Sequence, residues 1–212
     1  MWSKGRAGLL RSATLATVAG LAVTAGGIAS AGAASASASS ALTVKYKVTG
    51  STFLKSVNTT ATLGPGTLTS KVNLGNGKLT ASLSLPAATV SFKEFGLVPV
   101  TATTEFVQDG PTTGQLNVST GAVSTTSKII LKLTSMNVAG LPVPVPSGCQ
   151  SAPATIKLAS LKGFSVVSGG NLAGTYTIPK FSGCGLLTPV LNLTIPGSGN
   201  TIALKLGKAK RV

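Results

Sequence analysis

The sequence predicts an all-β fold, a single-domain antiparallel sandwich or barrel of about ten to twelve short strands over residues 42–206. Hydrophobic residues make up 43% of the 212-residue chain and aromatic residues only 4%, so Ala, Val, Leu and Ile dominate beside abundant Thr and Ser. The 26 Gly and 11 Pro supply turns, and β-branched, turn-rich usage favours strands. From Leu42 onward, apolar and polar residues alternate as in a strand with one wet face.

A hairpin is predicted over residues 67–85. Thr67–Leu74 and Leu79–Leu85 flank Gly75-Asn76-Gly77-Lys78, and Asn-Gly is the preferred centre of a two-residue hairpin turn because both positions need positive φ. With Asn76 and Gly77 at the tip, the apolar residues pair on one face: Leu74 with Leu79, Val72 with Ala81, and Leu68 with Leu85. A one-residue slip would scramble the polar and apolar faces, so the register should be well specified.

The other expected strands lie between turn clusters such as Asp109-Gly110-Pro111. They are Thr43–Thr49, Thr89–Phe95, Val100–Val107, Gln115–Ser119, Ala122–Val138, Thr155–Leu161, Phe164–Ser168, Leu172–Ile178, Val190–Ile195 and Thr201–Leu206. Ala122–Val138 is too long for one ordinary strand, so we expect a bend or bulge between its polar half and Ile129-Ile130-Leu131. Leu141–Pro146 alternates proline with apolar residues, which forbids regular pairing and favours an extended connection.

The first 33 residues have the pattern of a cleaved secretory signal peptide. Lys4, Arg6 and Arg11 form a basic start, Ala13–Ile28 is an apolar stretch, and small-x-small cleavage patterns follow up to Ala36. Residues 34–41, rich in Ala and Ser, are expected to be a disordered start. The alternative is a membrane anchor, which is disfavoured because the apolar stretch is shorter than the roughly 20 residues that span a bilayer. We therefore expect a secreted, extracellular protein.

Two cysteines, Cys149 and Cys184, are predicted to form a disulfide. An exported chain with an even cysteine count most simply pairs them, and each follows a Ser-Gly dipeptide in a turn that leads toward a strand. A metal site or a reactive thiol is the alternative. Both are weak, because the chain has no His and no carboxylate nearby in the sequence to complete a zinc shell.

The chain is poor in catalytic groups, and we expect no enzyme, no cofactor and no metal site. Without His, no Ser-His or Cys-His dyad can form. The acids are Glu94, Glu105 and Asp109, and two of them could in principle hydrolyse a glycoside. Glu105 falls on a predicted strand and Asp109 in a turn, however, where solvated roles are common. A Ser-Lys pair stays formally possible, but no spacing singles one out.

The charge balance points to anionic partners. Eighteen Lys and Arg stand against three acids, a net of +15, and removal of Lys4, Arg6 and Arg11 with the leader leaves +12. Such a field favours anionic cell-wall polymers or an acidic lipid surface. Specific nucleic-acid binding is not expected, because it would normally add Arg forks and stacking aromatics.

Lysines on predicted strands have wet-face positions, where their usual role is solubility. The densest cluster of basic residues lies at the end of the last predicted strand and in the basic tail, residues 207–212. It consists of Lys205, Lys208, Lys210 and Arg211. This cluster is the candidate contact with an anionic surface. A solvated, frayed chain end is the alternative interpretation of the same residues.

Several stretches resemble a type of secreted, β-rich protein from high-GC Gram-positive bacteria that is described only as uncharacterised. The stretches are Leu133–Pro142, Ser147-Gly148-Cys149, Leu172–Phe181, Gly183-Cys184-Gly185 and Ile195–Thr201. The resemblance implies an exported β-rich domain with paired cysteines. It implies no particular activity and no site.

Two functions remain open at this stage. The first is a non-catalytic protein of the cell envelope, a binding or structural module held there by its positive surface. The second is an extracytoplasmic carrier whose barrel encloses an apolar ligand such as a lipid or isoprenoid, as closed eight-stranded barrels can. A cavity lined by Leu, Ile and Val would favour the carrier, and a filled interior the structural role. The oligomeric state is left open.

We predict that the mature protein begins between Gly32 and Ser39, because this window follows every plausible small-residue cleavage site. Amino-terminal sequencing of protein from the culture medium checks this. Secreted material that begins at Met1 would contradict it.

Overall fold

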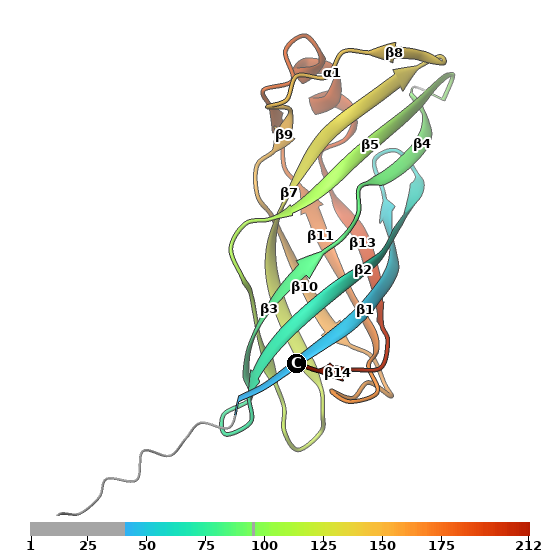
Figure 1. Ribbon diagram of the computed structural model, residues 1–212. Coiled ribbons are helices and arrows are strands. Elements are labelled where there is room, and N and C mark those ends of the chain that lie inside the picture. Colours follow the sequence, from blue (N-terminus) through green and yellow to red (C-terminus); the bar gives the residue numbers. More distant parts are fainter. Residues whose placement is uncertain (1–40, 95) are drawn as a thin grey trace, which may run out of the picture. The chain divides into compact units, whose positions relative to one another are not determined.

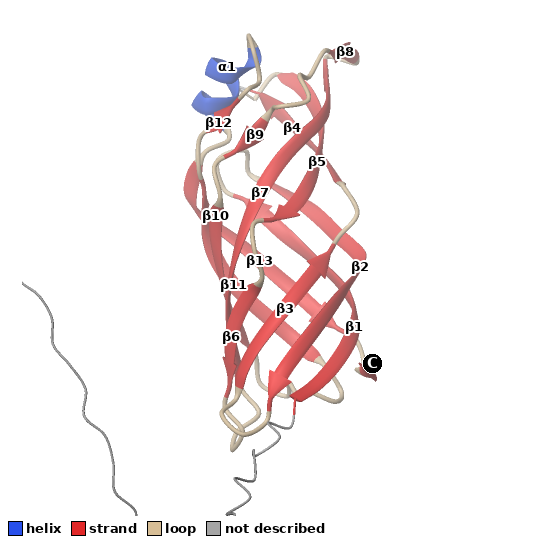
Figure 2. Ribbon diagram, turned by 60° about the vertical axis from the view of Figure 1, so that its left-hand side comes forward, coloured by secondary structure: helices blue, strands red, loops and turns tan. Residues whose placement is uncertain are grey.

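The computed structural model describes residues 41–94 and 96–212, which form an antiparallel β-barrel with additional strands (Figure 1). The predicted all-β class is confirmed, with a barrel rather than a sandwich. The strands are β1 (Ala41–Leu54), β2 (Thr59–Asn73), β3 (Lys78–Ser84), β4 (Ala88–Glu94), β5 (Val98–Gln108), β6 (Thr112–Leu116), β7 (Val123–Val138), β8 (Leu141–Val143), β9 (Gln150–Ser151), β10 (Ala154–Ser160), β11 (Gly170–Ile178), β12 (Phe181–Ser182), β13 (Gly197–Leu206) and β14 (Lys210–Arg211). One helix, α1 (Leu187–Thr194), lies at one end of the barrel (Figure 2). The predicted signal peptide (1–33) and most of the predicted disordered start (34–41) lie outside the described residues.

Eight strands close the barrel in the order β10-β11-β13-β1-β2-β3-β6-β7, and β7 pairs back onto β10. All of these ladders are antiparallel. The alternation of burial along β1 follows the sequence pattern: Val44, Tyr46 and Val48 are buried, while Lys45 and Lys47 are exposed. Period-two patterning thus sends one face of each strand into the core and the other to solvent.

Strand β7 is long because it serves two halves of the barrel. Its first residues pair with β6, and Ile129–Val138 pairs with β5, which continues to β4 (Figure 2). The expected irregularity is present, but it lies at Thr134, where one extra residue separates the partners of Thr103 and Thr104. The sequence predicted it before Ile129, between the polar and apolar halves of β7. No bulge is needed there, because the two halves pair with different strands, β6 and β5, along one continuous strand.

Strand β3 extends beyond the end of its ladder with β6, and a side chain forms hydrogen bonds with its backbone there. The ladder between these strands ends at Ala81 and Thr112, so the next backbone groups of β3 need other partners. Gln108 supplies them: its Oε1 accepts the Leu83 N–H at 2.8 Å, and its Nε2 donates to the Ala81 carbonyl at 3.0 Å. This amide therefore takes the place of a missing strand residue.

The hairpin between β2 and β3 is present, but its predicted register is wrong by two residues. Val72 lies opposite Leu79, and Leu68 opposite Leu83. The turn is longer than two residues because the Asn73 side chain accepts the backbone N–H groups of Gly75 and Asn76. A slip of two residues keeps every side chain on its predicted face. Leu74, which leaves the ladder, becomes 44% exposed.

Two predicted strands are wrong. Val190–Ile195 lies mostly in α1, whose core contacts are Leu187, Leu191 and Ile195, spaced four residues apart as on a helix face. Pro189 falls in the first turn, where the missing N–H costs nothing. Phe164–Ser168 is a turn closed by a bridge between Ser165 and Gly169. It turns Phe164 and Val166 toward the core, so these apolar residues plug the barrel end.

Several boundaries differ from expectation: β6 covers Thr112–Leu116 rather than Gln115–Ser119, and β2 begins at Thr59 rather than Thr67. Part of the proline segment pairs after all: β8 lies against Met136–Val138 of β7. Proline is accepted there because Pro142 alternates with Leu141 and Val143, and in an antiparallel pair only alternate residues direct their N–H groups to the partner. Strand β13 also begins at Gly197, four residues before the expected start at Thr201.

The Gln108 bridge gives a stability prediction. Gln108→Leu leaves the Leu83 N–H and the Ala81 carbonyl without this partner, so the free energy of unfolding should fall by about 1–3 kcal/mol. Chemical denaturation measures the loss. The matched control is Gln115→Leu, whose amide hydrogen-bonds at an exposed site and can be replaced there by water. Equal costs for the two variants would contradict the bridging role.

Candidate functional site: a basic face on the barrel wall

The carboxy-terminal tail is part of the sheet, so the frayed-end interpretation is wrong. Lys210 and Arg211 form β14, which pairs with Val44 and Lys45 of β1 (Figure 1). The Val212 N–H donates to the Thr43 carbonyl at 3.2 Å, and the Ala209 N–H donates to the Val167 carbonyl at 2.9 Å. These backbone bonds anchor the tail, while the side chains of Lys208, Lys210 and Arg211 stay exposed.

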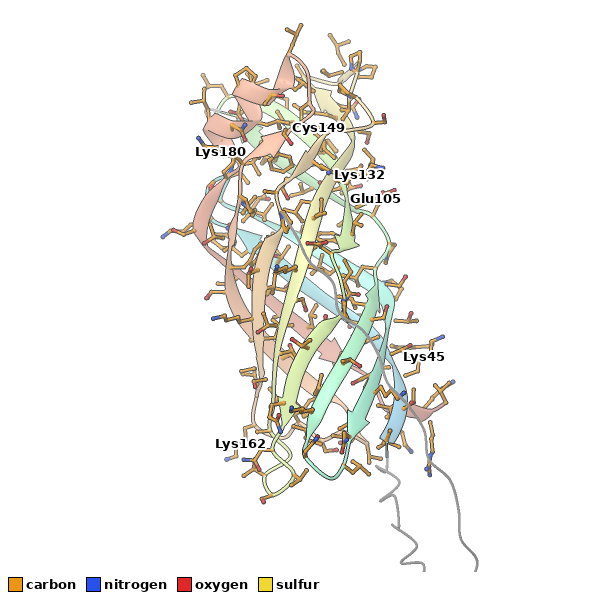
Figure 3. The ribbon with its side chains drawn as sticks, turned by 90° about the vertical axis from the view of Figure 1, so that its left-hand side faces the viewer. Lys45, Glu105, Lys132, Cys149, Lys162 and Lys180 are labelled. Atoms are coloured by element: carbon orange, nitrogen blue, oxygen red, sulfur yellow. A yellow bond between two sulfur atoms is a disulfide. The ribbon has the colours of Figure 1, made fainter. Side chains whose placement is uncertain are left out.

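The tail pairing brings together basic residues from the two ends of the domain. Lys45 lies directly opposite Lys210, and the Lys47 carbonyl accepts the Gly207 N–H at 2.9 Å. Figure 3 shows Lys45 on the outside of the barrel, next to β14. We define the basic face as the exposed cations on β1, β2, β13 and the tail: Lys45, Lys47, Lys71, Lys205, Lys208, Lys210 and Arg211.

The basic face contains an unfavourable arrangement. Like charges directly opposite each other in a ladder destabilise the pair, and Lys45 and Lys210 are placed in this way. None of the three acids is near in the sheet: Glu94 ends β4, Glu105 lies on β5, and Asp109 follows β5. No Asp or Glu side chain lies on β1, β2, β13 or β14, so the charged side chains of this face are all positive and can contact an external anion.

The three acids do not form a catalytic cluster. Glu105 lies opposite Lys132 in the β5–β7 ladder. Oε1 of Glu94 is buried and has no hydrogen-bond partner among the described residues. Within residues 41–94 and 96–212, no three His, Cys, Asp or Glu side chains gather in a way that could hold a metal ion.

A groove crosses the opposite wall of the barrel. It encloses about 970 Å³ over β3, β6, β7, β10 and β11 and lies between Lys78 and Lys157. A row of cross-strand neighbours, Thr80, Thr113 and Thr126, leads to Lys157. Hydroxyl groups and two cations line this groove without a carboxylate, so it also suits an anionic or hydroxylated partner.

The predicted disulfide between Cys149 and Cys184 is present. Both cysteines are buried, and the bond joins the segments just outside the small β9–β12 ladder. Cys149 leads into β9 as expected, but Cys184 leads into α1 rather than a strand. The bond thereby fixes the start of the helix to the end of the barrel. No helix in the described part of the chain is long and apolar enough to cross a bilayer.

The barrel interior is apolar, and small cavities remain between its side chains. It holds cavities of about 60 Å³ toward the β14 end, about 30 Å³ in the middle and about 70 Å³ toward α1. The two tyrosines point into it. Burial raises the pKa of Tyr46 to about 12, and its hydroxyl donates to the Val166 carbonyl at 2.6 Å. Burial also raises the pKa of Tyr176, whose hydroxyl bonds to Thr52.

Comparison with protein families, with curated proteins and with solved structures found no significant match to this chain. What the protein binds is therefore inferred from its own residues.

Four of the seven cations of the basic face were predicted from the sequence. Lys205, Lys208, Lys210 and Arg211 were candidates for anionic contact, and the structure brings them together with the lysines of β1 and β2. Lys45, Lys47 and Lys71 were interpreted only as solubilising residues. Their wet-face positions were visible in the pattern, but the pairing of residue 45 with residue 210 has no local sequence signal.

The repulsion within the basic face can be tested by stability. Lys210→Gln should raise the denaturation midpoint slightly at low ionic strength, because it removes the cation opposite Lys45, and the gain should vanish at high salt. The control is Lys157→Gln on β10, because Lys157 is exposed outside the basic face and lies opposite Thr126 of β7. If both variants respond equally to salt, the repulsion is not local.

Proposed function

We propose that this is an exported, non-catalytic protein of the cell envelope, held there by electrostatic contact between its basic face and anionic wall polymers. The observation that carries the proposal is the pairing of Lys45 with Lys210 inside a face that has no acid. An external anion bound at this face would offset the repulsion between the two ammonium groups. Wall polymers with repeating negative charge would meet several of these cations together.

The extracellular location is part of the same proposal. Its support is the basic and apolar start of the sequence with its small-residue cleavage patterns, together with the disulfide, a bond typical of oxidising compartments. The groove between Lys78 and Lys157 adds a second polar surface on the other wall. A polymer longer than one face could contact both surfaces.

Retention should depend on salt. Exposed charges are screened within about 8 Å at physiological ionic strength and about 3 Å at 1 M, so the protein should leave isolated cell walls as salt rises between these limits. The experiment is a stepwise salt wash of walls loaded with purified protein. Protein that stays bound through 1 M salt, or never binds at low salt, would contradict electrostatic retention.

Two charge-matched variants separate the basic face from net charge. Lys208, Lys210 and Arg211 are changed together to Gln; the β14 pairing uses backbone groups, so the fold should persist. The control changes Lys93, Lys128 and Lys180, exposed lysines outside the basic face, to Gln. The tail variant should elute at lower salt than the control. Equal elution would mean that net charge alone holds the protein, and preferential binding to vesicles of acidic lipid over walls would reassign the partner.

A further inference from the structure

The three interior cavities are arranged as one interrupted channel along the barrel. The cavity at the β14 end is called the lower cavity and the cavity beneath α1 the upper cavity. Leu83 lines both the lower and the middle cavity. Phe106, Leu131 and Tyr176 line both the middle and the upper cavity. Neighbouring cavities thus share lining side chains, and a chain that occupied all three cavities would have to displace these residues.

The walls of this channel do not favour water. Their side chains are mainly Leu, Val, Ile, Phe and Ala, and a dry apolar cavity of about 150 Å³ is known to bind small apolar molecules. The polar pair in the upper wall is already satisfied: Thr52 Oγ1 lies 2.7 Å from the Tyr176 hydroxyl and donates to the Thr201 carbonyl at 2.9 Å. The space therefore suits hydrocarbon.

The two ends of the channel are closed differently. At the β14 end, Phe164 and Val166 fill the opening, and the bond from the Tyr46 hydroxyl to the Val166 carbonyl fixes their loop. At the other end, Leu191 and Ile195 of α1 cover the upper cavity. The loop between β10 and β11 thus closes one end and is held there by a hydrogen bond, whereas the other end is covered by a helix of only two turns.

Besides its core contacts, helix α1 is held by the disulfide before it and by one side chain, and apolar residues also lie on its outer side. The disulfide lies just before it, and the Asn192 side chain bonds to both the N–H and the carbonyl of Phe181. Outward, Leu186 is 95% exposed and Leu193 is 80% exposed. A cover with apolar residues on its outer side can meet a hydrocarbon chain before that chain enters.

We infer that the barrel interior binds the single unbranched hydrocarbon chain of a fatty-acid-like amphiphile, which enters beneath α1. The carboxylate would stay at this end, where Lys180 stands beside the helix (Figure 3). The chain must be single and unbranched, because each cavity is far smaller than the 300 Å³ or more of ordinary ligand pockets and the bound methylenes would have to displace the side chains between the cavities. A methyl-branched isoprenoid or a two-chain lipid would need more width than these cavities offer.

The experiment uses the secreted, disulfide-bonded protein and cis-parinaric acid, an unbranched fatty acid that fluoresces in apolar surroundings. We expect enhanced emission on mixing, and displacement of the probe by saturated fatty acids. Their affinity should increase roughly fourfold for each added methylene, the gain from burying one such group, until the channel is full. This series uses the wild-type protein, so it is decisive even if a variant fails to fold.

Variants locate the site. Ala102→Leu and Ala88→Leu each place a larger side chain into the upper cavity, and each should weaken binding of the probe by about tenfold or more because the methylene sites are taken. The control is Ala203→Leu, the same substitution at an exposed position of β13, and it should leave binding unchanged.

Three results would overturn the inference. The first is no fluorescence enhancement by the wild-type protein. The second is an affinity that does not increase with chain length, which would indicate contact through the carboxylate alone. The third is equal binding by the Ala203 and Ala102 variants, which would place the probe outside the barrel. None of these results bears on retention by the basic face, which salt washing tests separately.

Discussion

The backbone hydrogen bonding of β7 is the interaction on which the rest of the structure depends. This 16-residue strand pairs with β5, β6, β8, β9 and β10. Its contact with β10 closes the ring, and its contact with β5 extends the wall toward α1. The Gln108 bridge accommodates the change of partner from β6 to β5 along it. A strand in this position cannot slip by one residue without breaking several ladders.

The local parts of this fold could be predicted from the sequence, and the long-range parts could not. Alternation placed Val44, Tyr46 and Val48 inside correctly, because the side-chain period of a strand is a local property. The β2–β3 register failed at Asn73, since a side chain that caps the turn competes with the two-residue hairpin. The sequence around Val190 alternates like a strand. The segment is a helix because it covers the end of the barrel, where Leu191 packs into the core, and this position is not recorded in the local sequence.

The candidate site divides in the same way. The cluster at the tail was visible in the composition of the last residues, and the cysteine pair was predicted from the even cysteine count and the expected export. That Lys45 and Lys210 would be neighbours depends on β1 being the partner of β14, a contact between residues at opposite ends of the domain. The interior cavities depend on how Leu83, Phe106 and Tyr176 fill the barrel, which no pattern along the chain records.

The position of β1 also determines when the protein can acquire its surface. The first strand of the barrel has β13 and β14 as partners on one side, so an incomplete chain, whether on the ribosome or partly through a membrane, lacks the segments that close the ring. Contacts between segments this distant in sequence form late, because the chain loses the entropy of loop closure before these contacts can stabilise it. The cations of the basic face then stay scattered along an open chain until its last residues arrive. The proposed multivalent attraction to an anionic polymer would therefore be a property of the finished barrel and not of the emerging polypeptide.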